Sequence, residues 1–409
     1  MPMMRRAVFG LLVLAMVGAT GGCSQASAIV IGAVYPTGPS HGPGGLEEYR
    51  GLLLAAERAN AGGGVGGRPV RIELERAESA DAAAGAVDRL ADDGVTVIAG
   101  SYGSTISRPA ASAATRRGVV FWETGAVGEL AMDAARGERV FRFPASGGVL
   151  GREAVAFVSD QLAPDVPLRF AIAYVDDPYG RAVADGAIAE ARVRDGEPAT
   201  FPYTLPDLDA DAIAREVASS GANVLVVVAY LDDGVELRRA VVRQRVPLVA
   251  NIGTSSSYCM PVFGDILGPD AVGVFASDKP DGDVIDADVL RDTGAELLRW
   301  GRDTYRDRYG EPMSAAALSG YAAGWALLGH VLPSAADLSP DSVAAAARSV
   351  RVVPGDLPNG SGLDLAGPDD LEPGSNLAAS SVIWQWVAPQ VREVVWPPTF
   401  ATHDGVPPA

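Results

Sequence analysis

The 409-residue chain has one lysine, Lys279, and only two cysteines and three histidines. It carries 51 acidic residues against 33 basic ones, a formal net charge of -18, and no basic stripe interrupts the acidity. Such a surface repels a phosphate backbone, so we expect no nucleic-acid partner. Because His41, His330 and His403 are widely dispersed and no C-x-x-C or H-E-x-x-H pair occurs, we also expect no metal site.

Motifs of enzyme active sites are also missing. No G-x-S-x-G nucleophile turn is present, and the one G-x-G-x-x-G, at Gly62, Gly64 and Gly67, follows a predicted helix and precedes a strand. A dinucleotide fingerprint has the opposite order, so these glycines indicate a helix stop. We therefore expect neither enzymatic activity nor a cofactor, although a hydrolase triad at unusual spacing remains an alternative.

The first residues indicate export. Arg5 and Arg6 precede an apolar run, residues 7–17, and small residues then lead to Cys23. That run is shorter than the roughly 20 residues of a membrane-spanning helix, which favours a signal peptide over residues 1–22. Residues 20–23 resemble a bacterial lipobox, so we expect a lipidated Cys23 and a tether over residues 23–27. An ordinary signal peptide with an incidental cysteine is the alternative. The other cysteine, Cys259, is expected to be free and buried, without a disulfide.

The chain is long enough for two globular lobes. From Ala28, apolar β-rich runs alternate with Ala-rich helical runs, which is typical of parallel sheets covered by helices. A first series predicts strands over residues 28–34, 70–74, 95–99 and 119–122, and helices over 46–59, 80–91 and 107–116. A second series predicts strands over 169–175, 200–205, 224–229, 248–251 and 272–276, and helices over 148–161, 180–193, 210–219 and 235–244. The predicted fold is α/β, with two doubly wound open-sheet lobes.

The remaining residues differ in pattern. Long helices are predicted over 288–309 and 314–332 and a shorter one over 341–349; no strand series accompanies them, so they should cover a lobe. The alternating run over residues 382–396, broken at Pro389 and Gln390, predicts a β-hairpin.

Polar residues follow the predicted strands of the first lobe, where open α/β sheets form their ligand crevice. Backbone N–H groups at the helix start near Ser104, with the Ser104 and Thr105 hydroxyls, predict a carboxylate site without a cation. Plain N-capping by Ser104 is the alternative. The candidate ligand-binding residues in this lobe are Tyr35, Ser104, Thr105, Trp122, Glu123, Gly125 and Ala126.

The second lobe has corresponding loops. Tyr179 follows Asp176 and Asp177, Tyr230 precedes Asp232 and Asp233, and Thr254 precedes a run of serines. Aromatic side chains at strand ends can cover an apolar solute. We therefore add Tyr179, Tyr230 and Thr254 to the candidates, with a purely structural role for each tyrosine as the alternative.

Five segments together resemble the leucine/isoleucine/valine-binding class of type I periplasmic binding proteins, the substrate-binding components of ABC importers. They are residues 31–39, 60–70, 94–104, 141–144 and 177–180, which span roughly the first half of the mature chain.

The resemblance implies two lobes that close around a solute about a three-crossing hinge near Ser146, Asp278 and Val353. The lobes would be residues 28–146 with 279–352, and residues 147–278 with 353–400. It implies that Ser104, Gly125 and Ala126 hold the ligand carboxylate, faced by Tyr179 and Tyr230. It also implies a lipid-anchored, extracytoplasmic monomer that binds a small carboxylated, amide-like or amino-acid-like solute and the permease subunits of an ABC importer.

One position departs from this pattern. The carboxylate for a ligand ammonium group should fall near Thr254, where the chain has only hydroxyl residues. The sequence therefore predicts that aliphatic amino acids are not the preferred ligands, unless Glu123, Asp232 or Asp233 supplies the acid. A sensor domain that signals rather than transports is the alternative function. A sensor would be expected to continue after Ala409 into a membrane helix and a cytoplasmic module, so we expect transport.

Overall fold

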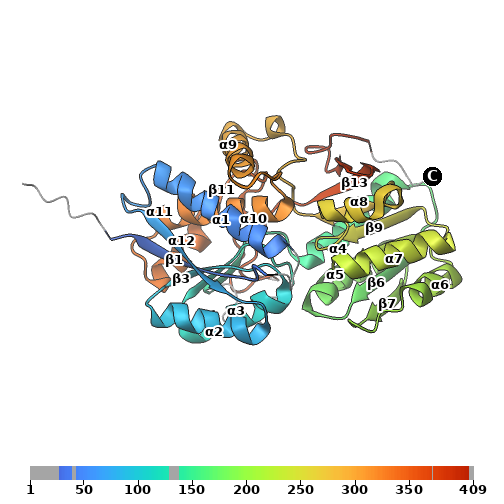
Figure 1. Cartoon of the computed structure of the whole chain (residues 1–409), viewed down its shortest axis with the longest axis horizontal. Helices are drawn as coiled ribbons and strands as arrows, with labels where there is room; N and C mark the ends of the chain where they lie inside the picture. Colours follow the sequence, from blue (N-terminus) through green and yellow to red (C-terminus); the bar gives the residue numbers. More distant parts are fainter. Residues whose placement is uncertain (1–26, 39–42, 129–137, 371, 405–409) are drawn as a thin grey trace, which may run out of the picture.

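The computed structural model describes residues 27–38, 43–128, 138–370 and 372–404. The predicted signal peptide and Cys23 lie outside these residues. Two β-sheets, each flanked by helices, lie side by side along the long axis of the molecule (Figure 1). The prediction of two doubly wound open sheets is confirmed.

The first sheet is parallel throughout and has the strand order β2-β1-β3-β4-β5. Its strands are β1 Ile29–Tyr35, β2 Val70–Arg76, β3 Val97–Gly100, β4 Val120–Glu123 and β5 Val140–Arg142. The helices between and beside these strands are α1 Gly44–Ala61, α2 Ala80–Asp92, α3 Ser104–Arg117, α9 Asp292–Tyr309, α10 Ala315–Trp325, α11 Leu332–Ser334 and α12 Pro340–Ser349. The late helices join this half, because α10 packs along α1.

The second sheet has the order β14-β13-β10-β9-β8-β6-β7. Its parallel part, read as β7-β6-β8-β9-β10, repeats the order of the first sheet. The strands are β6 Phe170–Val175, β7 Ala199–Tyr203, β8 Val224–Val228, β9 Ala250–Thr254, β10 Phe275–Asp278, β13 Val382–Ala388 and β14 Val391–Trp396. The accompanying helices are α4 Gly147–Phe157, α5 Pro178–Arg194, α6 Ala210–Ser220, α7 Leu231–Gln244 and α8 Pro261–Leu267.

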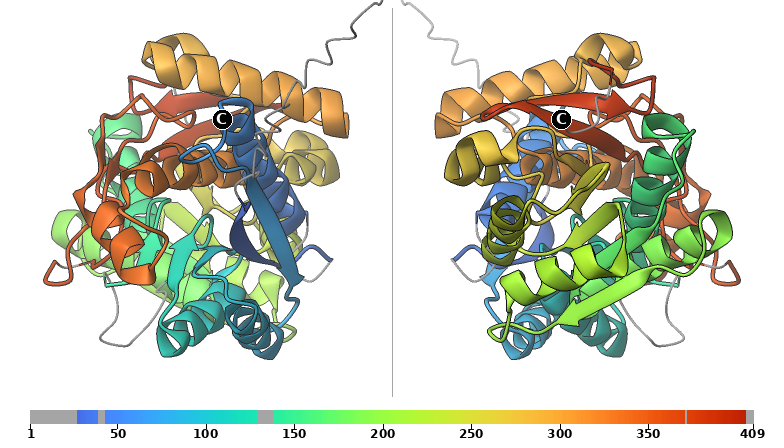
Figure 2. Two further views of the ribbon diagram at one scale, coloured as in Figure 1. Left: turned by 90° about the vertical axis from the view of Figure 1, so that its left-hand side faces the viewer. Right: turned by 90° about the vertical axis from the view of Figure 1, so that its right-hand side faces the viewer.

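The predicted C-terminal hairpin is present. β13 and β14 pair antiparallel and extend the second sheet beyond β10. Both end views show the hairpin along the same side of the molecule as α9 (Figure 2). Trp384 and Trp386 on β13 are fully buried, so this late segment belongs to the hydrophobic core.

Local sequence explains where the elements begin. Ser79 caps α2 by accepting the N–H of Ala82, and Asp177 caps α5 by accepting that of Gly180, with Pro178 in the first turn. Strand β8 consists of Val and Leu and is buried at every position, as expected at the centre of a parallel sheet.

Helix α10 and its continuation over residues 315–334 are long and apolar enough to cross a membrane. Most of that stretch is buried inside the molecule. We therefore assign it as a core helix that packs on α1.

Some predicted boundaries were wrong near the facing ends of the two sheets. β9 covers 250–254 rather than 248–251, and β10 covers 275–278 rather than 272–276. α7 begins at Leu231, four residues before the prediction. Strand β5 and helix α8 were not predicted, nor was the short pair β11 Arg351–Val352 with β12 Leu363–Asp364. The residues that carry β9 on to Thr254 and β10 on to Asp278 are mostly small or polar, which is why the strands were predicted to end earlier. All of them are buried in the structure.

Candidate functional site

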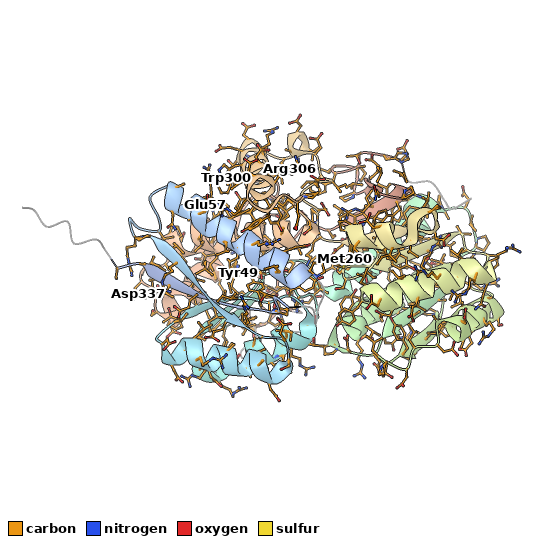
Figure 3. All side chains as sticks on the ribbon, viewed as in Figure 1. Tyr49, Glu57, Met260, Trp300, Arg306 and Asp337 are labelled. Carbon is orange, nitrogen blue, oxygen red and sulfur yellow. The ribbon has the colours of Figure 1, made fainter. Side chains whose placement is uncertain are left out.

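A cavity of about 550 Å³ lies where strand ends of the two sheets face each other. From the first half it is lined by residues of α1, the start of α3, the loop after β4 and the start of α10. From the second half it is lined by Tyr179, Tyr230 and residues 255–256 and 259–262, and Met260 lies at the junction of the two halves (Figure 3). Two open α/β sheets therefore present their crevices to one shared space.

Ser104 is the first residue of α3 and lines the cavity. The N-cap is Gly103, and no side chain caps this helix, so the alternative of N-capping by Ser104 is wrong. Instead, the Ser104 hydroxyl oxygen accepts the N–H of Gly128 at 3.0 Å. The hydroxyl proton remains available as a donor, beside the uncapped positive end of the helix.

The two halves are in contact beside Ser104. A Cβ atom on Gly128 would lie 2.8 Å from the carbonyl oxygen of Pro178, which belongs to the second half. Gly128 therefore allows a close approach between the end of the β4 loop and the start of α5.

Glu123 is fully buried behind the cavity wall. Its Oε1 accepts the N–H groups of Ser101, Gly125 and Ala126 at 3.0, 2.8 and 2.7 Å, and its Oε2 accepts the Ser107 hydroxyl. Burial raises the pKa of this carboxyl to about 7, although the hydrogen bonds oppose the shift. The β3 and β4 loops are thus held together by one side chain.

These hydrogen bonds reduce the number of free N–H donors that the β4 loop has for a solute. The N–H groups of Gly125 and Ala126 point inward to Glu123, so they are not available to a ligand carboxylate. The predicted carboxylate role of these two residues therefore has no free donor to support it, although both line the cavity.

A second buried carboxyl lies behind the same loop. Tyr35 donates to the Thr124 hydroxyl at 2.6 Å, and Thr124 donates to Glu48 Oε1 at 2.5 Å. A Cβ atom on Gly125 would overlap Glu48 Oε2, so only glycine fits there. Burial raises the pKa of Glu48 to about 8, despite the opposing charge of Lys279.

The second half contributes a pair of tyrosines. The rings of Tyr179 and Tyr230 have centroids 5.4 Å apart. The Tyr179 hydroxyl lies 2.9 Å from Thr254 Oγ1, and the Tyr230 hydroxyl donates to Asp177 at 2.6 Å. Each ring is thus fixed from behind while lining the cavity.

Of the ten candidate ligand-binding residues, five line the cavity: Ser104, Gly125, Ala126, Tyr179 and Tyr230. The other five, Tyr35, Thr105, Trp122, Glu123 and Thr254, do not line it. Trp122 is buried in the core, where its indole N–H donates to Ala323 at 2.9 Å. Tyr35, Glu123 and Thr254 support the wall through the hydrogen bonds described above, so the prediction placed these side chains on the wrong side of it.

The acids considered as substitutes at Thr254 are also away from the cavity. Glu123 is occupied by backbone N–H groups, and Asp233 accepts the Tyr203 hydroxyl in a buried position. Burial raises the pKa of Asp233 to about 6. Neither Asp232 nor Asp233 lines the cavity.

Sequence reasoning missed two charged residues at the end of β10, Asp278 and Lys279, which line the cavity. Lys279 donates to the carbonyl oxygen of Gly125 at 3.0 Å, and its ammonium nitrogen lies 5.8 Å from the centre of the Tyr102 ring. The signal was the chain's only lysine directly after a strand. Glu47, Arg50 and Cys259 also line the cavity and were not predicted.

Among the residues that the structure describes, no cluster of three His, Cys, Asp or Glu side chains could hold a metal ion. Cys259 is buried and free. The cavity lining combines hydroxyl groups, aromatic rings, apolar side chains and several charged residues.

Comparison with known proteins agrees with this architecture. The chain is 26% identical over 346 residues to Leu/Ile/Val-binding protein homolog 8 of Brucella abortus, an alignment that covers 82% of this chain and 83% of that protein. Its fold matches the leucine-binding protein LivK of Thermotoga maritima with a TM-score of 0.73 at 17% identity, covering 90% and 97% of the two chains. It also matches a solute-binding protein of an ABC transporter from R. palustris, solved with benzoate, with a TM-score of 0.71 at 16% identity, covering 93% and 99%.

The identities of 16% and 17% to the two solved structures show only a shared fold. The family is established instead by a sequence match over most of the chain. Residues 28–370 match the family described as periplasmic binding protein. Together with a cavity between two doubly wound sheets, this match shows that the chain belongs to the periplasmic binding protein family and is an extracytoplasmic solute-binding protein rather than an enzyme.

Proposed function

We propose that this protein is the solute receptor of an ABC importer and that its cavity holds a small carboxylated solute, either an amino acid or a related acid. The observation that carries the proposal is the meeting of Ser104 and Tyr179, from opposite sheets, on one cavity of about 550 Å³. A cavity of that size suits a small molecule. Relatives of the same fold are named for leucine or were solved with benzoate, which supports solutes that carry a carboxylate.

The carboxylate would bind at the start of α3. The Ser104 hydroxyl is oriented by Gly128, and the helix start has no side-chain cap. Negative groups are stabilised at such helix ends. The Tyr179 and Tyr230 rings would cover the apolar part of the solute from the other side.

Closure about a hinge would bring these groups together. The proposed lobes are residues 28–146 with 279–352, and residues 147–278 with 353–400. Two observations support crossings near Ser146 and Asp278: β5 ends the first sheet at Arg142, and β10 ends at Asp278. The third crossing is better supported just before β13 than near Val353, because Arg291 forms an ion pair with Asp356 and Arg142 bonds with Gly374 and Asn376. The closed form of a monomer would then be presented to the permease.

Removal of the Ser104 hydroxyl or the Tyr179 ring should weaken solute binding about tenfold or more while leaving the fold intact. For Ser104, a lost hydrogen bond to a charged ligand group costs about 1.5 to 3 kcal/mol. For Tyr179, the loss is that of the apolar contact between its ring and the solute. The solute retained by the purified protein would be identified by mass spectrometry. It would then be titrated by calorimetry into the parent, Ser104→Ala and Tyr179→Ala.

Ser219→Ala is the matched control, because its exposed hydroxyl on α6 contacts only the Arg215 carbonyl. Parent-like affinity of both cavity variants would place the binding site elsewhere. A purified protein that neither retains nor binds any small solute would contradict the proposed function itself.

We further propose that the mature protein is anchored to the membrane through a lipid on Cys23. The support is the sequence alone: a short apolar run, small residues and one cysteine at the expected cleavage point. Cys23→Ala, with the signal peptide removed, should move from the membrane fraction to the soluble fraction. Cys259→Ala is the control and should stay with the membrane, and retention of the Cys23→Ala protein would refute the anchor.

A further inference from the structure

Arg392 lies behind the cavity wall, on strand β14 of the C-terminal hairpin. Its side chain is 8% exposed, and it does not itself line the cavity. The guanidinium carbon lies 5.2 Å from the centre of the Trp384 ring and 5.6 Å from that of Trp386. The guanidinium also donates to the carbonyl oxygen of Cys259, a residue of the cavity wall. These contacts all belong to the second half of the molecule, so they fix the Arg392 side chain within that half.

A further contact of Arg392 reaches the first half. Its Nη2 atom lies 3.0 Å from the Oδ2 atom of Asp281, whose side chain is 1% exposed. Among the described residues, nothing donates a hydrogen bond to this Oδ2 atom, so the contact is an ion pair that does not meet hydrogen-bond geometry. Two opposite charges therefore face each other where water hardly reaches, and their attraction is strong there.

Asp281 lies just after the end of β10, where the chain has crossed to the first half. Its Oδ1 atom accepts the N–H of Asp283 at 2.9 Å. Asp283 pairs with Arg306 of α9 at 2.8 Å, and Arg302 of the same helix donates to the carbonyl oxygen of Gly282. Helix α9 packs on α1, and it lies along the same side of the molecule as the hairpin (Figure 2). Asp281 is therefore fixed to the first half, as Arg392 is to the second.

The crossing itself leaves little free chain between the two halves. Asp278 accepts the Ser255 hydroxyl of the second half at 2.8 Å, and the next residue, Lys279, donates to the Gly125 carbonyl of the first half at 3.0 Å. Both side chains belong to nearly fully buried residues. Because consecutive residues are held by opposite halves, a change in the angle between the halves must move Asp281 relative to β14.

The two halves are in contact in this structure. Helix α3 of the first half touches α5 of the second, and Gly128 lies close against the carbonyl oxygen of Pro178. The ion pair between Arg392 and Asp281 is therefore formed in an arrangement in which the halves have approached each other. If the halves separate, water can enter between the two charges, and an ion pair in water contributes little.

Removing one partner of a buried ion pair is strongly unfavourable, because the other charge stays buried without compensation. That cost falls on the closed arrangement, since separation of the halves lets the remaining charge be hydrated. We propose that Arg392 is a positioning residue for solute binding: through Asp281 it stabilises the closed arrangement of the halves and thereby slows the release of a bound solute. This inference rests on the proposed function and goes beyond it, because it assigns a role to a side chain outside the cavity.

The test measures the rates of solute association and release by stopped-flow fluorescence. The probe is the solute that mass spectrometry identifies in the purified protein, or, if none is retained, whichever of the twenty common amino acids and benzoate binds. Arg392→Met should raise the release rate about tenfold or more, because Asp281 then lacks a counter-ion in the closed form. The association rate should change by less than about threefold, since the cavity lining is unchanged.

Further variants separate the ion pair from other effects. Arg392→Lys keeps the charge and should keep most of the slow release. Asp281→Asn approaches the pair from the other half and keeps the test available if Arg392→Met does not fold. The double variant Asp281→Asn/Arg392→Met should release the solute no faster than the faster single variant, because both changes remove one interaction. Arg243→Met is the control: it breaks an ion pair of 2.7 Å with Asp211 inside the second half and should leave both rates unchanged.

Two results would overturn the inference. One is an Arg392→Met protein that is folded by circular dichroism and releases the solute at the parent's rate, which would leave Arg392 with a purely structural role. The other is a double variant whose release rate combines the full effects of both single variants. A parent protein that binds none of the probes would contradict the proposed function and the inference together, whereas parent-like rates in the variants would remove the inference alone.

Discussion

Replacing Glu123 with leucine should lower the free energy of unfolding by at least about 3 kcal/mol and abolish solute binding. The carboxylate accepts three backbone N–H groups and one hydroxyl in a fully buried position. Leucine has a similar size but no acceptor. The N–H groups of Ser101 and Gly125 would be left without a partner, whereas that of Ala126 also reaches the Ser101 carbonyl oxygen at 3.0 Å. Each buried donor left without a partner costs about 1 to 3 kcal/mol, so these two and the Ser107 hydroxyl outweigh the gain from no longer burying a carboxyl group.

The loss of binding has a geometric cause. Glu123 connects Ser101, which precedes α3, with Gly125 and Ala126 in the β4 loop. Both loops line the cavity. Without the common acceptor, the start of α3 and the Gly125 carbonyl that holds Lys279 lose their fixed separation.

Urea unfolding followed by circular dichroism measures this prediction. Glu123→Gln is the matched variant, because its amide oxygen can still accept the three N–H groups, and it should lose less than half as much stability as the leucine variant. A leucine variant with the parent's unfolding midpoint would show that the backbone groups find other partners.

The fold was predictable because hydrophobic patterning and turn residues agree along most of the chain. α2 shows this clearly, with buried Ala83, Ala86, Val87 and Leu90 at helical spacing after a Ser79 cap. The hairpin was identified from an alternating run interrupted at Pro389 and Gln390. Both signals are local and need no knowledge of packing.

The candidate site was only partly predictable, and the reason lies in burial. Strand β4 is buried at all four positions, so it has no alternation that would tell a side chain facing the cavity from one facing the core. Strand β9, which ends at Thr254, is buried at all five positions as well. Neither Glu123 nor Thr254 could therefore be assigned to a face, and neither lines the cavity. Asp278 was missed as a cavity-lining residue because a charged side chain is unexpected in a fully buried strand, so the predicted strand stopped at Ala276.

Glu48→Gln should flatten the dependence of stability on pH. The folded-state pKa of Glu48 is raised from 4.5 to about 8, chiefly by burial, with the nearby Lys279 acting in the opposite direction. The native protein therefore keeps this proton over a range in which the unfolded chain has lost it. Stability must then fall as the pH rises from about 5 towards 8.

The expected size of the effect follows from the same linkage. About three pH units at about 1.4 kcal/mol per unit give a loss of about 4 kcal/mol from Glu48 between these pH values. Glutamine has the same shape, accepts the Thr124 hydroxyl in the same way and carries no proton to lose. Glu123 and Asp233, whose pKa values are raised to about 7 and about 6 by burial, act in the same direction and leave a smaller slope in the variant.

This prediction is tested by measuring the free energy of unfolding at several pH values between about 5 and 8. Glu216→Gln is the control, because it removes one exposed carboxylate. The Glu48→Gln curve should cross that of the parent and lie above it at the alkaline end. If the parent, the control and the Glu48 variant give parallel curves, Glu48 is ionised in the native protein. Lys279 would then have a counter-ion inside the protein.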